Sequence, residues 1–400
     1  MDISRFHASV QKAVLPAQRP TDGTWQLSGS AGWNGVFRQL VLGFLITAAA
    51  IASDAPTNSL PARTGEFRGA WIHSGYGIEG WGWDNTVAVL ASNGFNAILP
   101  NLLWGGLAHY PSKLLPVSSK VKAQGDQLAE CLRACRKYGI ELHVWKVNYN
   151  LATAPREFVQ QMRAAGRTQK DRAGRDVDWL CPSHDETFAL ERDSMLEVAR
   201  EYAVDGIHFD YIRYPDRNAC FCDGCRQRFE KSNGMKLVKW PEDALDGEAA
   251  ATFADWRREQ ITRLVRAVSD AAHALQPKLQ VSAAVWGGWK SARESIGQDA
   301  QAWIDAGCLD FVCSMNYEGD DEVFAELTRK QVAAANHKTP LYIGLGAHKL
   351  TGPEQLARQI RLSRELGARG FVVFQLNEKV ATQFLPKLSV AISTVQRRAE

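Results

Sequence analysis

The sequence has no strong excess of charge of either sign. Its 400 residues contain 47 Lys and Arg against 44 Asp and Glu, which gives a net charge of +3. It also has no long run of Lys and Arg. Proteins that bind nucleic acid usually carry a basic patch or stripe that meets the phosphates. We therefore expect no nucleic-acid partner.

Long apolar runs are scarce as well. The run at 40–52 has 13 residues, whereas a membrane-spanning helix needs about 20. Arg38 precedes it and Ala-Ile-Ala at 50–52 ends it, which is typical of a secretory signal peptide with its cleavage site; a buried helix is the alternative. We expect residues 1–39 to be an N-terminal extension, which a true translation start further along the chain would explain. Residues 53–65 would be a linker. The protein would be exported, periplasmic or extracellular, and without a stable membrane span.

The region after the first predicted strand lacks the glycine-rich fingerprint of nucleotide-binding open sheets. Strand-like and helix-like stretches instead alternate over 66–395. The predicted strands are 67–73, 95–104, 140–148, 206–214, 279–287, 310–317, 340–348 and 370–377. Eight strands alternating with helices predict an α/β protein, a (β/α)8 TIM barrel. An open doubly wound sheet is the alternative.

Tryptophan, histidine, amide and carboxylate side chains gather at the predicted strand ends, where TIM-barrel active sites lie. Many of the 13 Trp fall there. Aromatic faces combined with amides and carboxylates suit sugar rings, so carbohydrate is the simplest ligand. The candidate substrate-binding residues are Trp71, His73, Asn101, Trp104, Trp145, Asn148, His208, Arg213, Trp286, Asn316, Tyr317, His348, Gln375 and Glu378.

The segment DGIHFDYIRYP at 205–215 places charged residues in a buried strand. Alternation predicts that one face meets the helices, with Ile207, Phe209 and Tyr211. The inward face would hold His208, Asp210 and Ile212. A buried carboxylate must be paired or hydrogen-bonded. Asp210 is therefore either a catalytic carboxylate or the structural partner of Arg213, whose charge would lower the pKa of Asp210 and favour a nucleophile or stabilising anion.

Three cysteines lie within six residues in the loop after the fourth strand, which we expect to be an insertion: Cys220, Cys222 and Cys225. Zinc takes four ligands, and Cys181 or His184 could supply the fourth. A disulfide, for example to Cys181, and free thiols are the alternatives. A thiolate-rich site leaves no open position, so we expect no catalytic metal and no cofactor for catalysis. The remaining cysteines are interpreted as small buried apolar residues: Cys131, Cys135, Cys308 and Cys313.

Four motifs carry a family resemblance: EFRGAWI at 66–72, NLLWGGLAHYPSKLLP at 101–116, DGIHFDYIRYP at 205–215 and CFCDGCRQRF at 220–229. Together they resemble the glycosyl hydrolase-like family 10, also called the DUF187 family, over about 66–380. The resemblance implies a TIM barrel exported from bacteria and acting on glycan. Some relatives are linked to bare glycan strands of peptidoglycan, others to polysaccharide-degrading systems. Within the family Asp210 looks like the best-placed catalytic carboxylate.

Glycoside hydrolysis normally requires a second carboxylate. The candidates, in order, are Glu318, Asp320 and Glu378, although similar proteins often have a non-acidic residue at the position of Glu318. We expect an exported glycoside hydrolase that cleaves a polysaccharide or a peptidoglycan glycan strand. A barrel that binds glycan without cleaving it, and a lyase or transglycosylase, are the alternatives. The sequence leaves the sugar, the linkage, the stereochemistry and the oligomeric state open.

Overall fold

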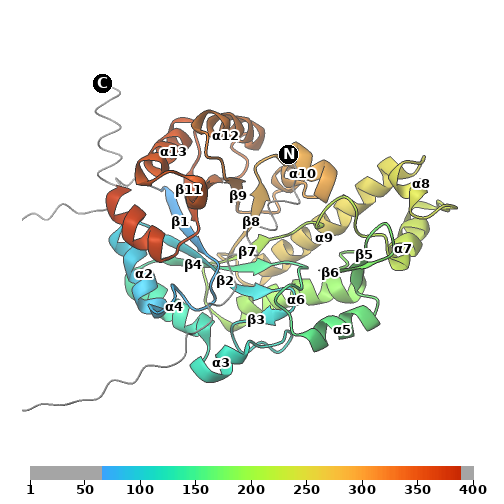
Figure 1. Cartoon of the computed structure of the whole chain (residues 1–400), viewed down its shortest axis with the longest axis horizontal. Helices are drawn as coiled ribbons and strands as arrows, with labels where there is room; N and C mark the ends of the chain where they lie inside the picture. The colour runs from blue at the N-terminus through green and yellow to red at the C-terminus, as the bar shows by residue number, and fades with distance from the viewer. Residues whose placement is uncertain (1–64, 389–400) are drawn as a thin grey trace, which may run out of the picture. The chain divides into compact units, whose positions relative to one another are not determined.

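The structure, a computed structural model, describes residues 65–388 (Figure 1). The expected leader at 40–52, the extension before it, nearly all of the linker and the end of the predicted barrel after 388 lie outside the described residues.

Eight parallel strands form a closed barrel. They are β1 (Phe67–Ile72), β2 (Ala97–Trp104), β4 (Glu141–Val147), β7 (Gly206–Asp210), β8 (Gln280–Trp286), β9 (Phe311–Asn316), β10 (Leu341–Gly346) and β11 (Gly370–Phe374). Each pairs in parallel with the next, and β1 pairs with both β2 and β11, which closes the ring. The predicted TIM barrel is confirmed, and every predicted strand is present.

Helices alternate with the strands and lie around the barrel (Figure 1). The main ones are α2 (Gly82–Ser92), α4 (Gln127–Tyr138), α5 (Arg156–Ala164), α6 (Asp185–Glu201), α9 (Ala250–Leu275), α11 (Ala300–Asp305), α12 (Asp321–Ala335) and α13 (Pro353–Glu365). Short turns at Val380–Phe384 and Leu385–Lys387 follow the last strand. Within residues 65–388 no helix combines the length and apolarity needed to cross a bilayer.

Local sequence explains where a helix such as α4 begins and ends. Asp126 precedes it and accepts a 3.0 Å hydrogen bond from the backbone N–H of Ala129, which satisfies one of the free donors of the first turn. Gly139 follows it with a φ of 67°, a left-handed conformation that glycine adopts without steric cost.

Several short elements interrupt the regular pattern in the connections that follow the strands. They are β3 (Leu107–Ala108), α3 (Ser119–Gln124), the hairpin β5 (Thr168–Lys170) and β6 (Asp176–Leu180), α7 (Asp223–Asn233), α8 (Glu242–Leu245), α10 (Trp289–Ile296) and η1 (Ala347–Lys349). The loop before α7 joins the hairpin through a 2.8 Å hydrogen bond from the Phe221 N–H to the Lys170 carbonyl. The insertion expected after the fourth strand thus packs against the connection after the third.

Apolar side chains form three clusters. One fills the barrel and includes Phe67, Trp71, Leu99, Trp145, Phe311 and Val372. The largest lies between the strands and the helices, and includes Ile98, Leu142, Ile207, Phe209 and Ile343. A small third cluster packs the insertion against the first turns of α9, and includes Phe221, Phe229, Leu237 and Phe253. The alternation of β7 explains why Ile207 and Phe209 pack outward, as predicted.

Candidate active site

Aromatic rings line the carboxyl ends of the strands, and we call this set the aromatic mouth: Trp71, His73, Trp104, Trp145, Tyr317, His348 and Phe374. The His73 ring centroid lies 5.5 Å from those of both Trp104 and Trp145. On the other side, Tyr317 stacks on Phe374 at 5.2 Å. Phe374 bridges the two sides, since its ring lies 6.5 Å from Trp145.

Phe374 is not among the candidates predicted from the sequence, which predicts a last strand at 370–377 and names Gln375 on it. Two-residue alternation puts Phe374 on the same face as Val372, which packs inside the barrel. Gln375 is half-buried beyond the strand end.

Asp210 ends β7 inside this mouth, and the residue is 6% exposed. Its Oδ1 accepts a 2.7 Å hydrogen bond from the backbone N–H of Tyr211. Burial raises the pKa of Asp210 to about 6, against the smaller opposing effects of the Tyr211 N–H, the Arg213 charge and the adjoining Trp145 indole. Arg213 lowers this pKa, as predicted, but the net shift is upward because desolvation of the carboxylate outweighs the nearby positive charge. The preference for an ionised Asp210 that was based on Arg213 is therefore not supported.

Asp210 and Arg213 do not form the ion pair that the sequence left open. Among the described residues, no Lys or Arg nitrogen forms an ion pair within 4.0 Å of the Asp210 carboxylate. The Arg213 guanidinium instead donates a 3.1 Å hydrogen bond to the backbone carbonyl of Tyr214. The interpretation of Asp210 as one half of a bracing ion pair is therefore wrong.

Arg213 lies between aromatic rings instead. Its guanidinium carbon is 4.4 Å from the ring centroid of Tyr211, 5.4 Å from Trp179 and 5.5 Å from Trp286. Tyr211 also stacks on Trp179, with centroids 5.5 Å apart. Contacts of this kind hold a buried cation without a carboxylate partner.

The predicted alternation of the fourth strand fails after Asp210. Tyr211 has a φ of 52°, so the chain leaves the extended conformation there and the two-residue periodicity ends. Tyr211 contacts both the inner and the outer apolar clusters. Ile212, predicted to point into the barrel, belongs to the outer cluster.

His208 lies deeper inside the barrel and is fully buried. Its Nε2 accepts a 3.1 Å hydrogen bond from the Trp71 indole, and its Nδ1 lies 2.8 Å from Ser282 Oγ. Both ring nitrogens are thus bound by the protein. The structure places His208 beneath the mouth rather than at its surface.

Two of the predicted amides face away from the mouth. Asn148 is buried, and its Nδ2 donates a 2.8 Å hydrogen bond to Glu191 on α6. Asn316 is buried too, and its Nδ2 donates to Thr328 and Gln331 on α12. Both side chains brace the strand-to-helix layer and are not available to a ligand in the mouth.

Several buried polar atoms on the barrel strands have no hydrogen-bond partner among the described residues, and three of them belong to the candidate residues on β2, β4 and β8. These three are the indole nitrogens of Trp145 and Trp286 and the Oδ1 of Asn101. Asn101 Nδ2 is occupied, since it donates a 3.0 Å hydrogen bond to the Leu103 carbonyl. Buried polar atoms are normally satisfied, so the Trp286 indole and the Asn101 Oδ1 are available to water or to a bound ligand. The Trp145 indole adjoins Asp210 and lowers the pKa of that carboxyl.

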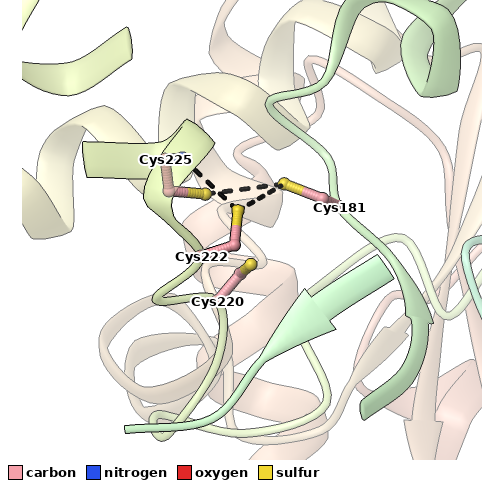
Figure 2. A group of neighbouring side chains, drawn as sticks. All are labelled: Cys181, Cys220, Cys222 and Cys225. Atoms are coloured by element: carbon pink, nitrogen blue, oxygen red, sulfur yellow. Dashed lines mark hydrogen bonds between the residues drawn. The ribbon is translucent and has the colours of Figure 1, made fainter. Parts of the chain in front are cut away.

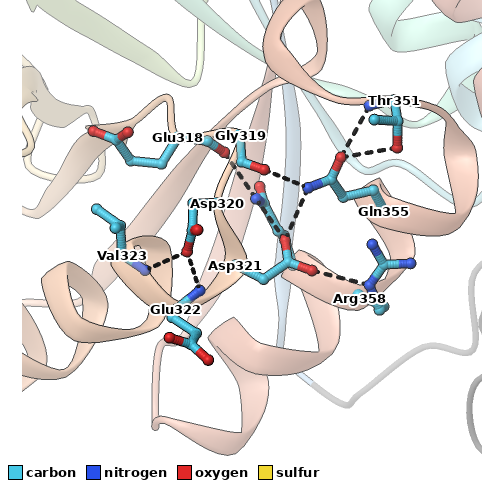
Figure 3. A network of polar contacts seen from close by, with 10 residues as sticks. Glu318, Gly319, Asp320, Asp321, Glu322, Val323, Thr351, Gln355 and Arg358 are labelled. Carbon is cyan, nitrogen blue, oxygen red and sulfur yellow. Dashed lines mark hydrogen bonds and ion pairs between the residues drawn. The ribbon is translucent and has the colours of Figure 1, made fainter.

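The two acidic candidates after β9 differ in what they bind (Figure 3). Asp320 is exposed and caps α12, because its Oδ1 accepts hydrogen bonds from the N–H groups of Glu322 and Val323 at 2.8 and 3.0 Å. Glu318 is half-buried, and its carboxylate points away from the polar network drawn around Asp321. Among the described residues its carboxylate has no hydrogen-bond partner, whereas its backbone carbonyl accepts from Gln359 Nε2 and its N–H donates to the Asn316 carbonyl, both at 2.9 Å.

Asp321, which the sequence did not single out, anchors that network. It accepts hydrogen bonds from Gln355, Gln359 and Arg358 of α13 at 3.1, 3.1 and 2.9 Å. Glu378 is exposed and follows β11. His348 is also exposed and follows β10, the neighbouring strand.

The four predicted metal-site cysteines come together in one buried group. The Sγ atoms of Cys181, Cys220, Cys222 and Cys225 all lie within 4.8 Å of one another, and all four residues are buried. His184 is not part of this group. The other four cysteines are buried, as the sequence predicted.

A closed barrel with a buried carboxylate in an aromatic mouth defines a protein of the TIM-barrel glycosidase type. The sequence profile of the family described as Glycosyl hydrolase-like 10 matches residues 66–360, and the chain belongs to this family. The recognised motifs at 66–72 and 205–215 lie within the matched range.

Curated relatives carry the same designation. The chain is 23% identical over 331 residues to "Glycosyl hydrolase YngK" of Bacillus subtilis (strain 168). The aligned region covers 71% of this chain and 61% of the relative. It is 24% identical over 305 residues to "Glycosyl hydrolase DigH" of Escherichia coli (strain K12), which covers 66% of this chain and 64% of the relative. The chain thus matches less than two thirds of the length of these relatives.

Solved structures share the fold. The glycoside hydrolase domain of PgaB (BpsB) from Bordetella bronchiseptica superposes with a TM-score of 0.63 at 14% identity, covering 82% of this chain and 97% of that one. The catalytic domain of a Paenibacillus polymyxa β-amylase gives a TM-score of 0.59 at 13% identity, covering 82% and 98%. At such identities the likeness supports the barrel alone.

Proposed function

We propose that the protein is an exported glycoside hydrolase that cleaves glycosidic bonds in a polysaccharide or a peptidoglycan glycan strand. The observation that carries the proposal is Asp210, a buried carboxyl at the end of a barrel strand, without an ion-pair partner among the described residues, and with its pKa raised to about 6. The family membership and the names of the relatives support the same class of reaction.

Asp210 would act as the general acid. A carboxyl group with a pKa near 6 keeps a protonated fraction close to neutral pH, whereas an ordinary aspartate does not. The proton would pass from Asp210 to the glycosidic oxygen as the bond from that oxygen to the anomeric carbon breaks. The leaving sugar would then depart as an alcohol.

Glu318 is the preferred second carboxylate. Its side chain is free of the helix cap that occupies Asp320. Glu318 directly follows Tyr317. Burial raises the pKa of the Tyr317 phenol, and the charge of Asp210 raises it further, so Tyr317 lies near Asp210. Glu318 would either attack the anomeric carbon or accept a proton from the attacking water. A carboxylate separation of about 5–5.5 Å would indicate the first, and about 6.5–9.5 Å the second.

The aromatic mouth would bind the sugar rings. Trp104 and Tyr317 would offer faces for stacking, and Arg213 lies between the rings of Tyr211 and Trp286. The Trp286 indole would donate a hydrogen bond to a sugar hydroxyl, since a buried donor without a partner is otherwise costly. The Trp145 indole is directed at Asp210 and would help to hold that carboxyl in place.

The test is a product analysis with the purified protein on peptide-free peptidoglycan strands and on common polysaccharides. Hydrolysis adds one water for each bond cleaved and creates a new reducing end, which mass spectrometry detects. The Asp210→Asn variant should give none of these products while still binding the active glycan.

Other product patterns would refute the proposal. Unsaturated or anhydro sugar ends would indicate a lyase or transglycosylase. Binding without any product, in both the wild type and Asp210→Asn, would indicate a barrel that only recognises glycan.

A further inference from the structure

The cysteine cluster joins two separate connections of the barrel (Figure 2). Cys181 follows β6, whereas Cys220, Cys222 and Cys225 lie in the loop that leads into α7 and in its first turn. Figure 2 shows the four side chains pointing toward one another. The two segments are about forty residues apart in sequence, so the cluster is a tertiary feature of the fold.

The spacing of the sulfur atoms suits a metal. The Sγ of Cys181 lies 3.5 Å from that of Cys225 and 3.9 Å from that of Cys222. Four thiolates arranged as a tetrahedron at about 2.3 Å from a zinc ion lie about 3.8 Å apart. The sulfur atoms of a disulfide lie about 2.05 Å apart. The observed separations match the first arrangement.

Neighbouring groups compensate negative charge at the cluster. Cys222 caps α7, and its Sγ accepts a 3.4 Å hydrogen bond from the Cys225 N–H. The N-terminal end of a helix favours negative charge. Arg228 Nη2 lies 3.9 Å from the Cys181 Sγ, and Arg228 Nε donates a 3.1 Å hydrogen bond to Ser183 Oγ. Such contacts stabilise metal-bound thiolates.

We propose that Cys181, Cys220, Cys222 and Cys225 form a structural zinc site. Four thiolates around one zinc ion close its coordination shell, so the ion holds the chain together and takes no part in chemistry. His184, the other candidate for the fourth ligand, is not needed. Zinc is preferred to iron because it undergoes no redox change, which suits the export that is part of the proposed function.

The zinc ion would brace one side of the aromatic mouth. Trp179 lies two residues before Cys181, and it stacks on Tyr211, which follows Asp210. The cross-link therefore ties the connection that carries Trp179 to the insertion that follows Tyr211 and Arg213. Loss of zinc should loosen this side of the mouth more than the barrel itself, because the barrel has its own apolar core.

The experiment measures zinc directly in the full chain, purified without chelators. Plasma mass spectrometry should find about one zinc per chain, in keeping with one four-ligand site. Cys181→Ser and Cys225→Ser should lower the zinc content at least tenfold. Cys308→Ser, which changes a buried cysteine outside the cluster, should leave it unchanged.

A second measurement on the wild type does not depend on whether the variants fold. X-ray absorption at the zinc edge should show only sulfur neighbours, at about 2.3 Å. Nitrogen or oxygen in the first shell, stoichiometric iron, a disulfide between any two of the four cysteines in a non-reducing peptide map, or metal-free thiols would each overturn the proposal.

Discussion

The indole N–H of Trp71 donates a 3.1 Å hydrogen bond to Nε2 of His208 across the inside of the barrel. An indole nitrogen can only donate, so Nε2 is the acceptor and the proton of the neutral ring lies on Nδ1. Nδ1 then donates to Ser282 Oγ, 2.8 Å away. Burial holds the pKa of His208 well below its usual 6.5, and the imidazole is neutral in the folded protein.

His208 should make the free energy of unfolding depend on pH. Below pH 6.5 the unfolded chain binds a proton at this histidine and the folded chain does not, so stability falls as the pH falls. His208→Gln should remove up to about 1.4 kcal/mol of this loss per pH unit. Chemical denaturation at pH 7, 6 and 5 measures the slope. The exposed His337→Gln variant should keep the wild-type slope, and an unchanged slope in His208→Gln would contradict the assignment.

Asp210→Asn should abolish turnover and raise the melting temperature at pH 7. The folded-state pKa of about 6 lies above the usual 3.8, so burying the ionised carboxylate destabilises the fold at neutral pH. A shift of that size corresponds to a few kcal/mol at most, on the order of 1.4 kcal/mol per pKa unit. The amide oxygen can still accept the Tyr211 N–H bond. The gain should disappear below about pH 4, where Asp210 is protonated in both states.

Asp205→Asn is the matched control for this substitution. Asp205 lies at the other end of the same strand and accepts a 2.8 Å hydrogen bond from the Leu142 N–H. Its substitution should leave turnover per folded molecule unchanged, because it is remote from the mouth. Full activity in Asp210→Asn together with a lower melting temperature would indicate that Asp210 has only a structural role.

The barrel could be predicted from the sequence because each strand and helix carries its own periodicity. The direction of single side chains at strand ends was harder. Asn148 lies three residues after the inward Trp145, so alternation already turns it toward α6. The direction of Tyr211 could not be predicted in this way. Its φ is positive where the strand ends, and no local sequence pattern predicts that conformation.

The charge state of Asp210 could not be predicted from its neighbours in sequence. Arg213 is only three residues away, yet its guanidinium lies among aromatic rings and not against the carboxylate. The pKa of Asp210 depends on how much water the side chains from β4, β7 and β9 exclude from the carboxylate. These side chains meet only in the assembled barrel.

A buried ion pair between Lys146 and Glu191 should be sensitive to the loss of one partner. Their charged atoms lie 3.3 Å apart and both side chains are fully buried between β4 and α6. Glu191→Leu should lower the free energy of unfolding by about 3–5 kcal/mol, because it leaves the ammonium group buried without a counter-charge. Denaturant titration measures the loss.

The double variant Lys146→Met with Glu191→Leu tests that explanation. Removing both charges should recover most of the loss, since apolar replacements of similar size are often tolerated. Glu326→Gln, at an exposed pair with Arg329, should have far less effect. A double variant as unstable as Glu191→Leu would indicate that packing or the loss of the acceptor for Asn148 Nδ2, and not the unpaired charge, is responsible.

Glu318→Gln and Asp320→Ala should separate catalysis from helix capping. Glu318→Gln removes the proposed second carboxylate and should lower kcat by roughly 10²-fold or more, as for the loss of one acid–base group, without lowering the melting temperature. Asp320→Ala removes the acceptor for the N–H groups of Glu322 and Val323 and should cost about 1 kcal/mol of stability. Its turnover per folded molecule should match the wild type.

Kinetics and thermal melts on the same preparations decide the roles. The reverse pattern would assign catalysis to Asp320, and full activity in both variants would leave Glu378 as the acidic candidate.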